Sequence, residues 1–113
     1  MLVLSRRIGE GFQISIGKQV FFIRYDRPAR VNGKRGVLCS LSGDIGGITA
    51  DAELKDFGNF KKFWVAYEGS VKLGLHGESL TMSIESPKDS RPLRGCRFGF
   101  DGPDFEILRE EIV

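Results

Sequence analysis

The chain has 113 residues, 41% of them hydrophobic. This suits one domain with its own core, because compact domains most often hold about 100–150 residues. The formal net charge of +2 is too small to indicate a nucleic-acid binder by itself, so any electrostatic argument depends on where the arginines lie. No apolar run approaches the roughly 18 residues of a membrane span, which excludes a bilayer-spanning helix.

The cysteine content argues against a metal centre. Cys39 and Cys96 lie far apart, neither belongs to a CxxC pair, and His76 is the one histidine that could assist them. The short apolar start is interrupted by Arg6 and Arg7, so it does not read as a secretion signal. We therefore expect a cytoplasmic protein, without metal or cofactor.

The pattern of apolar residues predicts a mostly β protein. The chain holds 15 glycines, which separate short stretches rich in Val, Ile, Phe and Leu, as is typical of brief strands joined by turns. The predicted strands are Met1–Arg7, Gly11–Ile16, Gln19–Tyr25, Gly36–Leu41, Phe63–Tyr67, Val71–Leu75, Leu80–Glu85, Arg97–Phe100 and Phe105–Arg109.

Two segments depart from this strand pattern. One short helix is predicted from Asp51 to about Phe57, with Asp51 as its N-cap and Gly58 as its stop. The stretch Asp26–Arg35 concentrates basic residues around a proline and a glycine and reads as an exposed loop. No internal repeat is apparent in the sequence.

Both ends of the chain carry a family resemblance. The opening MLVLSRRIGEGFQI resembles the start of CsrA/RsmE proteins, the carbon storage regulators, which are bacterial RNA-binding translational regulators. Near the other end, the run Arg97–Pro103 resembles the family's RIGVxAP strand and loop, and Ile107–Ile112 resembles its VHREEI. The two matches occur in the family's order along the chain.

The resemblance implies a fold and a domain organisation. In the family, five short strands per subunit interlock in a homodimer, and the first strand pairs with the last strand of the partner. The chain would then hold a CsrA-like core in two parts, residues 1–26 and 95–113, with residues 27–94 as an inserted β-rich subdomain between the third and fourth strands. No sequence after Val113 remains for the family's C-terminal helix.

The resemblance also implies the site residues. Leu4, Arg6 and Arg7 would contact RNA from one subunit, and Ile107 and Arg109 from the other. Arginine suits this role because its planar guanidinium bonds phosphate or a guanine edge in pairs. The loop Asp101, Gly102 and Pro103 matches the family loop whose backbone reads the bases. The expected partner is mRNA or a small RNA that displays GGA in a hairpin loop, where unpaired bases are open to readout.

Two departures bear on that expectation. Asp101 would bring a negative charge close to the RNA, and Gly102 stands where relatives usually carry alanine. The predicted insert carries an aromatic cluster, which would be large enough to build a satellite core; it consists of Phe57, Phe60, Phe63, Trp64 and Tyr67.

Other functions are less favoured by the residues. Lys61 and Lys62, between aromatic residues, could form a second nucleic-acid platform, although inward packing of the aromatics is favoured. No nucleophile, base and orienting group occur in a recognisable pattern, so the chain is not expected to be an enzyme. The main alternative is a scaffold or antagonist that uses the CsrA-like frame to dimerise and the insert to bind a protein partner.

Overall fold

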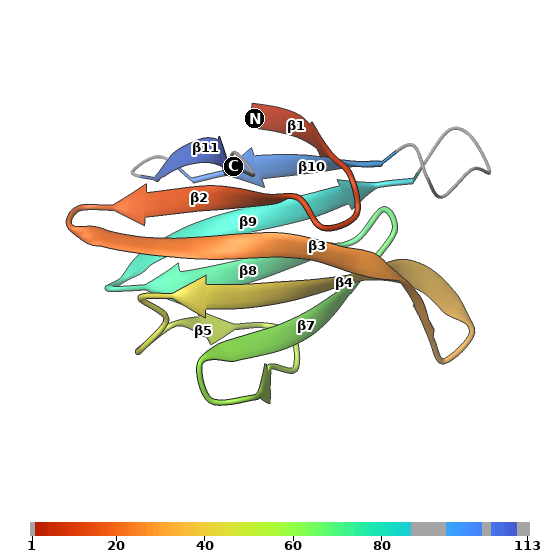
Figure 1. The fold of residues 1–113 in the computed structure, drawn as a ribbon, viewed down its shortest axis with the longest axis horizontal. Helices are drawn as coiled ribbons and strands as arrows, with labels where there is room; N and C mark the ends of the chain where they lie inside the picture. Colours follow the sequence, from red (N-terminus) through yellow and green to blue (C-terminus); the bar gives the residue numbers. More distant parts are fainter. Residues whose placement is uncertain (1, 87–94, 103–104, 111–113) are drawn as a thin grey trace.

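The computed structural model describes residues 2–86, 95–102 and 105–110, and these form an all-β protein of two antiparallel sheets (Figure 1). The strands are β1 (Leu2–Arg6), β2 (Gly11–Ile16), β3 (Gln19–Val31), β4 (Lys34–Gly43), β5 (Thr49–Ala50), β6 (Lys55–Asp56), β7 (Phe60–Ala66), β8 (Ser70–Leu75), β9 (Glu78–Glu85), β10 (Cys96–Asp101) and β11 (Glu106–Glu110). One sheet has the order β1-β10-β9-β8-β5, and the other has the order β11-β2-β3-β4-β7-β6. The expected mostly β class is confirmed.

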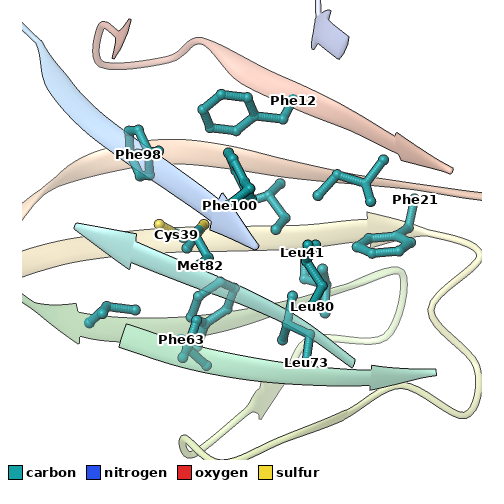
Figure 2. Packing of buried hydrophobic residues seen from close by; sticks show 14 of the residues in the cluster. Phe12, Phe21, Cys39, Leu41, Phe63, Leu73, Leu80, Met82, Phe98 and Phe100 are labelled. Atoms are coloured by element: carbon teal, nitrogen blue, oxygen red, sulfur yellow. The ribbon is translucent and has the colours of Figure 1, made fainter. Parts of the chain in front are cut away.

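The core lies between the two sheets and follows from the alternation of side chains along each strand. The buried apolar side chains are Phe12 and Ile14 in β2 and Leu80, Met82 and Ile84 in β9. Figure 2 shows Phe12 of one sheet and Leu80 and Met82 of the other pointing into this core. Phe12 packs edge-on against two rings of β10, and its centroid lies 5.1 Å from that of Phe98 and 4.8 Å from that of Phe100.

The helix predicted for Asp51–Phe57 is wrong. The described chain forms a bend at Asp51 and then the short strand β6, and Asp51 is held by β8: the Lys72 amide donates to Asp51 Oδ1 at 2.8 Å, and the Asp51 amide donates to the Lys72 carbonyl at 3.2 Å. Further along, Lys55 and Asp56 pair with β7. A helix of two turns is marginal on its own, because nucleation is costly, so strand pairing prevails.

The loop predicted for Asp26–Arg35 is instead a hairpin that extends β3 to Val31 and begins β4 at Lys34. Asn32 and Gly33 form its turn with φ of 51° and 80°, and two successive positive φ values are what a tight type I′ hairpin turn requires. Outside this turn, the Trp64 Nε1 donates to the Ala29 carbonyl at 3.0 Å. The Asn-Gly pair was the signal that the sequence reading missed.

The strand register reveals two halves of the chain with the same architecture. Ile14 of β2 pairs with Phe21 of β3, and the residues 59 positions later (73 − 14) pair in the same way, Leu73 of β8 with Leu80 of β9. Leu4 of β1 pairs with Phe98 of β10, and under the same offset Phe63 of β7 pairs with Cys39 of β4. The strands β1–β5 and β7–β11 are therefore structural repeats.

The turn after the first strand makes the same backbone hydrogen bond in both halves. The Gly9 amide donates to the Tyr25 carbonyl at 2.7 Å, and the Glu68 amide donates to the Ile84 carbonyl at 2.8 Å. Both donors have positive φ, 89° for Gly9 and 61° for Glu68. The two halves share few identical residues, so the sequence by itself showed no repeat. Backbone hydrogen bonds and burial preserve the architecture without identity of side chains.

The halves exchange strands with each other. The first strand of each half pairs with the fourth strand of the other, β1 with β10 and β7 with β4, and the fifth strand pairs with the second, β11 with β2 and β5 with β8. Interlocking of this kind was expected between two subunits. Within this chain β1 pairs with β10 and not with the last strand, and residues 27–94 supply strands to both sheets.

Candidate nucleic-acid interface

Arg6 and Arg7 lie at the end of β1, where the chain leaves the sheet. Leu4 packs against the core, and the alternation of β1 puts Arg6 on the same side two residues later. The Arg6 guanidinium donates to the Ser5 carbonyl at 2.9 Å and, through Nη1, to the Gly11 carbonyl at 3.4 Å. Arg7 is exposed, and its amide donates to Glu10 Oε1 at 2.7 Å.

Arg109 comes to the same region from the other end of the chain. It lies on β11, where its partner in β2 is Phe12, and Ile107 two residues earlier pairs with Ile14. Ile107 is half-buried and packs against the core, whereas Arg109 is exposed. The strand thus provides an apolar base from which the guanidinium projects into solvent.

The two terminal strands meet at one end of the sandwich, at the top of Figure 1. Arg6 of β1 contacts the carbonyl of Gly11, which immediately precedes the β2 partner of Arg109. Phe12 also spans the sheets, because its ring contacts Phe98, the β10 partner of Leu4. The structure therefore brings together Leu4, Arg6, Arg7, Ile107 and Arg109, which we call the β1–β11 end.

The loop residues from the same prediction lie elsewhere. Arg6 pairs with Cys96 at the start of β10, whereas Asp101 is the last residue of that strand. Five residues of strand separate them by roughly 16 Å. This exceeds the screening length of about 8 Å at physiological salt, so the exposed Asp101 carboxylate weakly affects the arginines. Pro103 lies outside the described residues.

Gly102 follows β10 and has a packing reason to be glycine. A Cβ atom at this position would lie 3.0 Å from both the Ser79 carbonyl oxygen and Leu80 Cδ1, and 3.2 Å from the Phe105 ring. These contacts are tighter than an ordinary van der Waals contact. Local packing therefore favours glycine at this position.

Sequence reasoning missed two features of the β1–β11 end. Arg24 of β3 is exposed and pairs with Gly11, so it places a further arginine two strands away from β11. Ile8 and Leu108 are large apolar residues that are 44% and 48% exposed. The alternation of β3 and β11 could have indicated Arg24 and Leu108, because outward-facing positions follow from the period of two, whereas Ile8 lies in the turn after β1.

The opposite end of the sandwich holds the basic aromatic segment of β7. Phe63 is buried in the core, so inward packing is confirmed for this residue, and Phe60 and Trp64 are half-buried on the other face. Lys62 forms an ion pair with Asp26 at 3.6 Å. Phe57 remains 53% exposed and stacks on Phe60 with the ring centroids 5.2 Å apart.

Both cysteines are buried and free, and burial raises the pKa of the Cys96 thiol to about 11 and that of the Cys39 thiol further. An unfolded thiol has a pKa of about 8.5. Above that pH the unfolded chain releases these protons while the folded chain keeps them, so stability should fall as pH rises from about 8.5 toward 11. We expect a lower urea midpoint at pH 9.5 than at pH 7.5. An equal drop in a Cys39→Ala/Cys96→Ala variant would contradict this assignment.

Within the part of the chain that the structure describes, no cluster of three or more His, Cys, Asp or Glu side chains is placed to hold a metal ion. No helix in those residues is long and apolar enough to cross a bilayer.

Fold and candidate site together define a class: an all-β sandwich of two strand-exchanged halves with an arginine-bearing edge at one end. Comparison with known proteins adds no relative, since no family model, no curated protein and no solved structure matches the chain.

Proposed function

We propose that the chain binds RNA at the β1–β11 end and acts as a post-transcriptional regulator that recognises GGA in mRNA or small-RNA hairpin loops. Binding at a ribosome-binding site would repress translation initiation or alter mRNA decay. The observation that carries the proposal is the approach of the two terminal strands: Arg6 donates to the Gly11 carbonyl, and Arg109, 103 positions later in the chain (109 − 6), pairs with the next residue, Phe12.

The chemistry of this end supports an RNA ligand. Three arginines supply donors for phosphates and guanine edges, and Leu4 and Ile107 form an apolar support beside them. The exposed side chain of Ile8, the residue after Arg7, adds apolar surface against which unstacked bases can pack. The exposure of Arg7 and Arg109 means that the described part of residues 27–94 leaves this surface accessible.

The test compares a hairpin displaying GGA in its loop with a hairpin whose loop is scrambled, by fluorescence anisotropy. We expect preferential binding of the GGA hairpin, with an affinity that falls as salt rises, because phosphate contacts release counterions. Equal binding of both hairpins would contradict sequence-specific recognition, and absence of binding to either would contradict the proposed function.

A protein partner is the second candidate, and the opposite end of the sandwich favours it. A groove of about 530 Å³ there is lined mainly by apolar atoms, with Phe63 and Trp64 among its residues, and Phe57 is more than half exposed. Exposed aromatic side chains are enriched at protein interfaces. If the Phe57→Ala variant lost binding to a protein partner but still bound the hairpin, the protein-binding role would belong to the end of the sandwich opposite the β1–β11 end.

A further inference from the structure

The β1–β11 end has a structural counterpart, because each half of the chain contributes the same strands. The counterparts of β1 and β11 are β7 and β5, and these lie together at the opposite end of the sandwich. Strand exchange between equivalent halves therefore produces two ends with the same backbone architecture.

On the first strand, the offset of 59 residues gives the counterparts of Leu4, Arg6 and Arg7. Leu4, which is partly buried, corresponds to Phe63, which is buried; each of the two apolar residues pairs with the fourth strand of the other half. Arg6 corresponds to Val65, which is 4% exposed, and Arg7 corresponds to Ala66. The apolar support is retained, but neither arginine is.

On the fifth strand, the register with the second strand of the other half gives the counterparts. Ile107 pairs with Ile14, and Ala50 pairs with Leu73, which is the counterpart of Ile14. Two residues later, Arg109 corresponds to Ala52, a half-buried residue packed against the core. All three arginines of the β1–β11 end are thus replaced by small or aliphatic residues at the β5–β7 end.

The lysines of β7 do not restore the lost charge at the equivalent place. Lys61 and Lys62 pair with Leu41 and Ser40, toward the end of β4 that corresponds to the Phe100 end of β10. They therefore lie at the other end of the strand from the counterpart of Arg6. Lys62 is also engaged by the Asp26 carboxylate.

We propose that a single chain is the complete RNA-binding unit, with the partner subunit of an interlocked dimer replaced by the chain's own second half and with one RNA surface instead of two. The number of RNA surfaces rests on the proposed function, and the monomeric state rests on the strand exchange alone. Residues 27–94 are then the end of the first half, the linker and the start of the second half.

The backbones of the two halves approach each other closely where the exchanged strands pair. A Cβ atom at Gly36 would lie 2.3 Å from the Val65 carbonyl oxygen, and one at Gly95 would lie 2.6 Å from the Arg6 carbonyl oxygen. Gly36 is the third residue of β4 and Gly95 immediately precedes β10, and each lies close to the end of the first strand of the other half. The two glycines differ by the same 59 residues (95 − 36) as the Val65 and Arg6 carbonyls that they approach. Both exchanged strand pairs therefore require a glycine at the equivalent position, and the single chain supplies both glycines.

The test has two independent arms. Light scattering coupled to size-exclusion chromatography should give the mass of one chain, 12.6 kDa, and a mass of about twice that value would overturn the monomer. Titration with the GGA hairpin at concentrations well above Kd should saturate at one hairpin per chain. Two hairpins per chain, or one hairpin shared by two chains, would overturn the single surface.

Paired variants locate the surface. Arg7→Ala/Arg109→Ala should weaken hairpin binding by at least about tenfold, whereas Lys61→Ala/Lys62→Ala at the other end should bind as the wild type does. Far-UV circular dichroism checks that both variants fold. Equal losses in both variants would overturn the proposal. If the wild type binds no hairpin, the proposed function fails, while the mass measurement still decides the monomeric state.

Discussion

Replacing Arg109 with alanine is expected to weaken binding of a GGA-loop hairpin by about 5- to 150-fold, equivalent to about 1–3 kcal/mol, if its guanidinium makes a bidentate base contact. The residue is exposed on β11, next to the apolar support of Ile107, so removal of its side chain leaves the core intact. The variant should therefore keep its thermal stability. Fluorescence anisotropy at physiological salt measures the loss directly.

A matched control separates this contact from a general loss of positive charge. Lys72 is exposed on β8, and its backbone amide, which a substitution leaves in place, is the group that bonds Asp51. We expect Lys72→Ala to retain the affinity of the wild type. If Arg109→Ala bound the hairpin as tightly as the wild type does, the assignment of Arg109 to the RNA surface would be refuted.

Replacing Phe12 with alanine is expected to lower the free energy of unfolding by about 3–5 kcal/mol, which is the usual range for truncation of a buried phenylalanine. Phe12 is fully buried on β2, and its ring contacts Phe98 and Phe100 on the facing sheet. Truncation therefore opens a cavity between the two sheets beneath the β1–β11 end. Urea unfolding monitored by tryptophan fluorescence gives the change.

The comparison for this loss is Phe57→Ala, because it removes the same side chain from a position that is 53% exposed. Its stacking on Phe60 contributes about 0.5–1.5 kcal/mol, so the variant should be clearly more stable than Phe12→Ala. Similar losses for the two variants would show that the contact between the sheets at Phe12 does not stabilise the fold as the structure indicates.

Much of the secondary structure was predictable from local patterns. The strands β2, β8 and β9 lie where alternating apolar residues place them, because burial on one face imposes a period of two. Phe63 was expected to face the core and is buried. The helix predicted near Asp51, by contrast, was not found. Local propensity favoured a helix there, and pairing with β8 decided otherwise.

The sequence by itself indicated the mostly β class, most strand positions, and the arginines and apolar residues at the two ends of the chain. Only the tertiary structure decided which of them meet: Arg6 and Arg109 lie at one end of the sandwich, and Asp101 lies at the other end of β10. The repeat also became apparent only in the tertiary structure, since few residues are identical between the two halves. Backbone pairing and burial constrain shape and polarity at each position far more than side-chain identity.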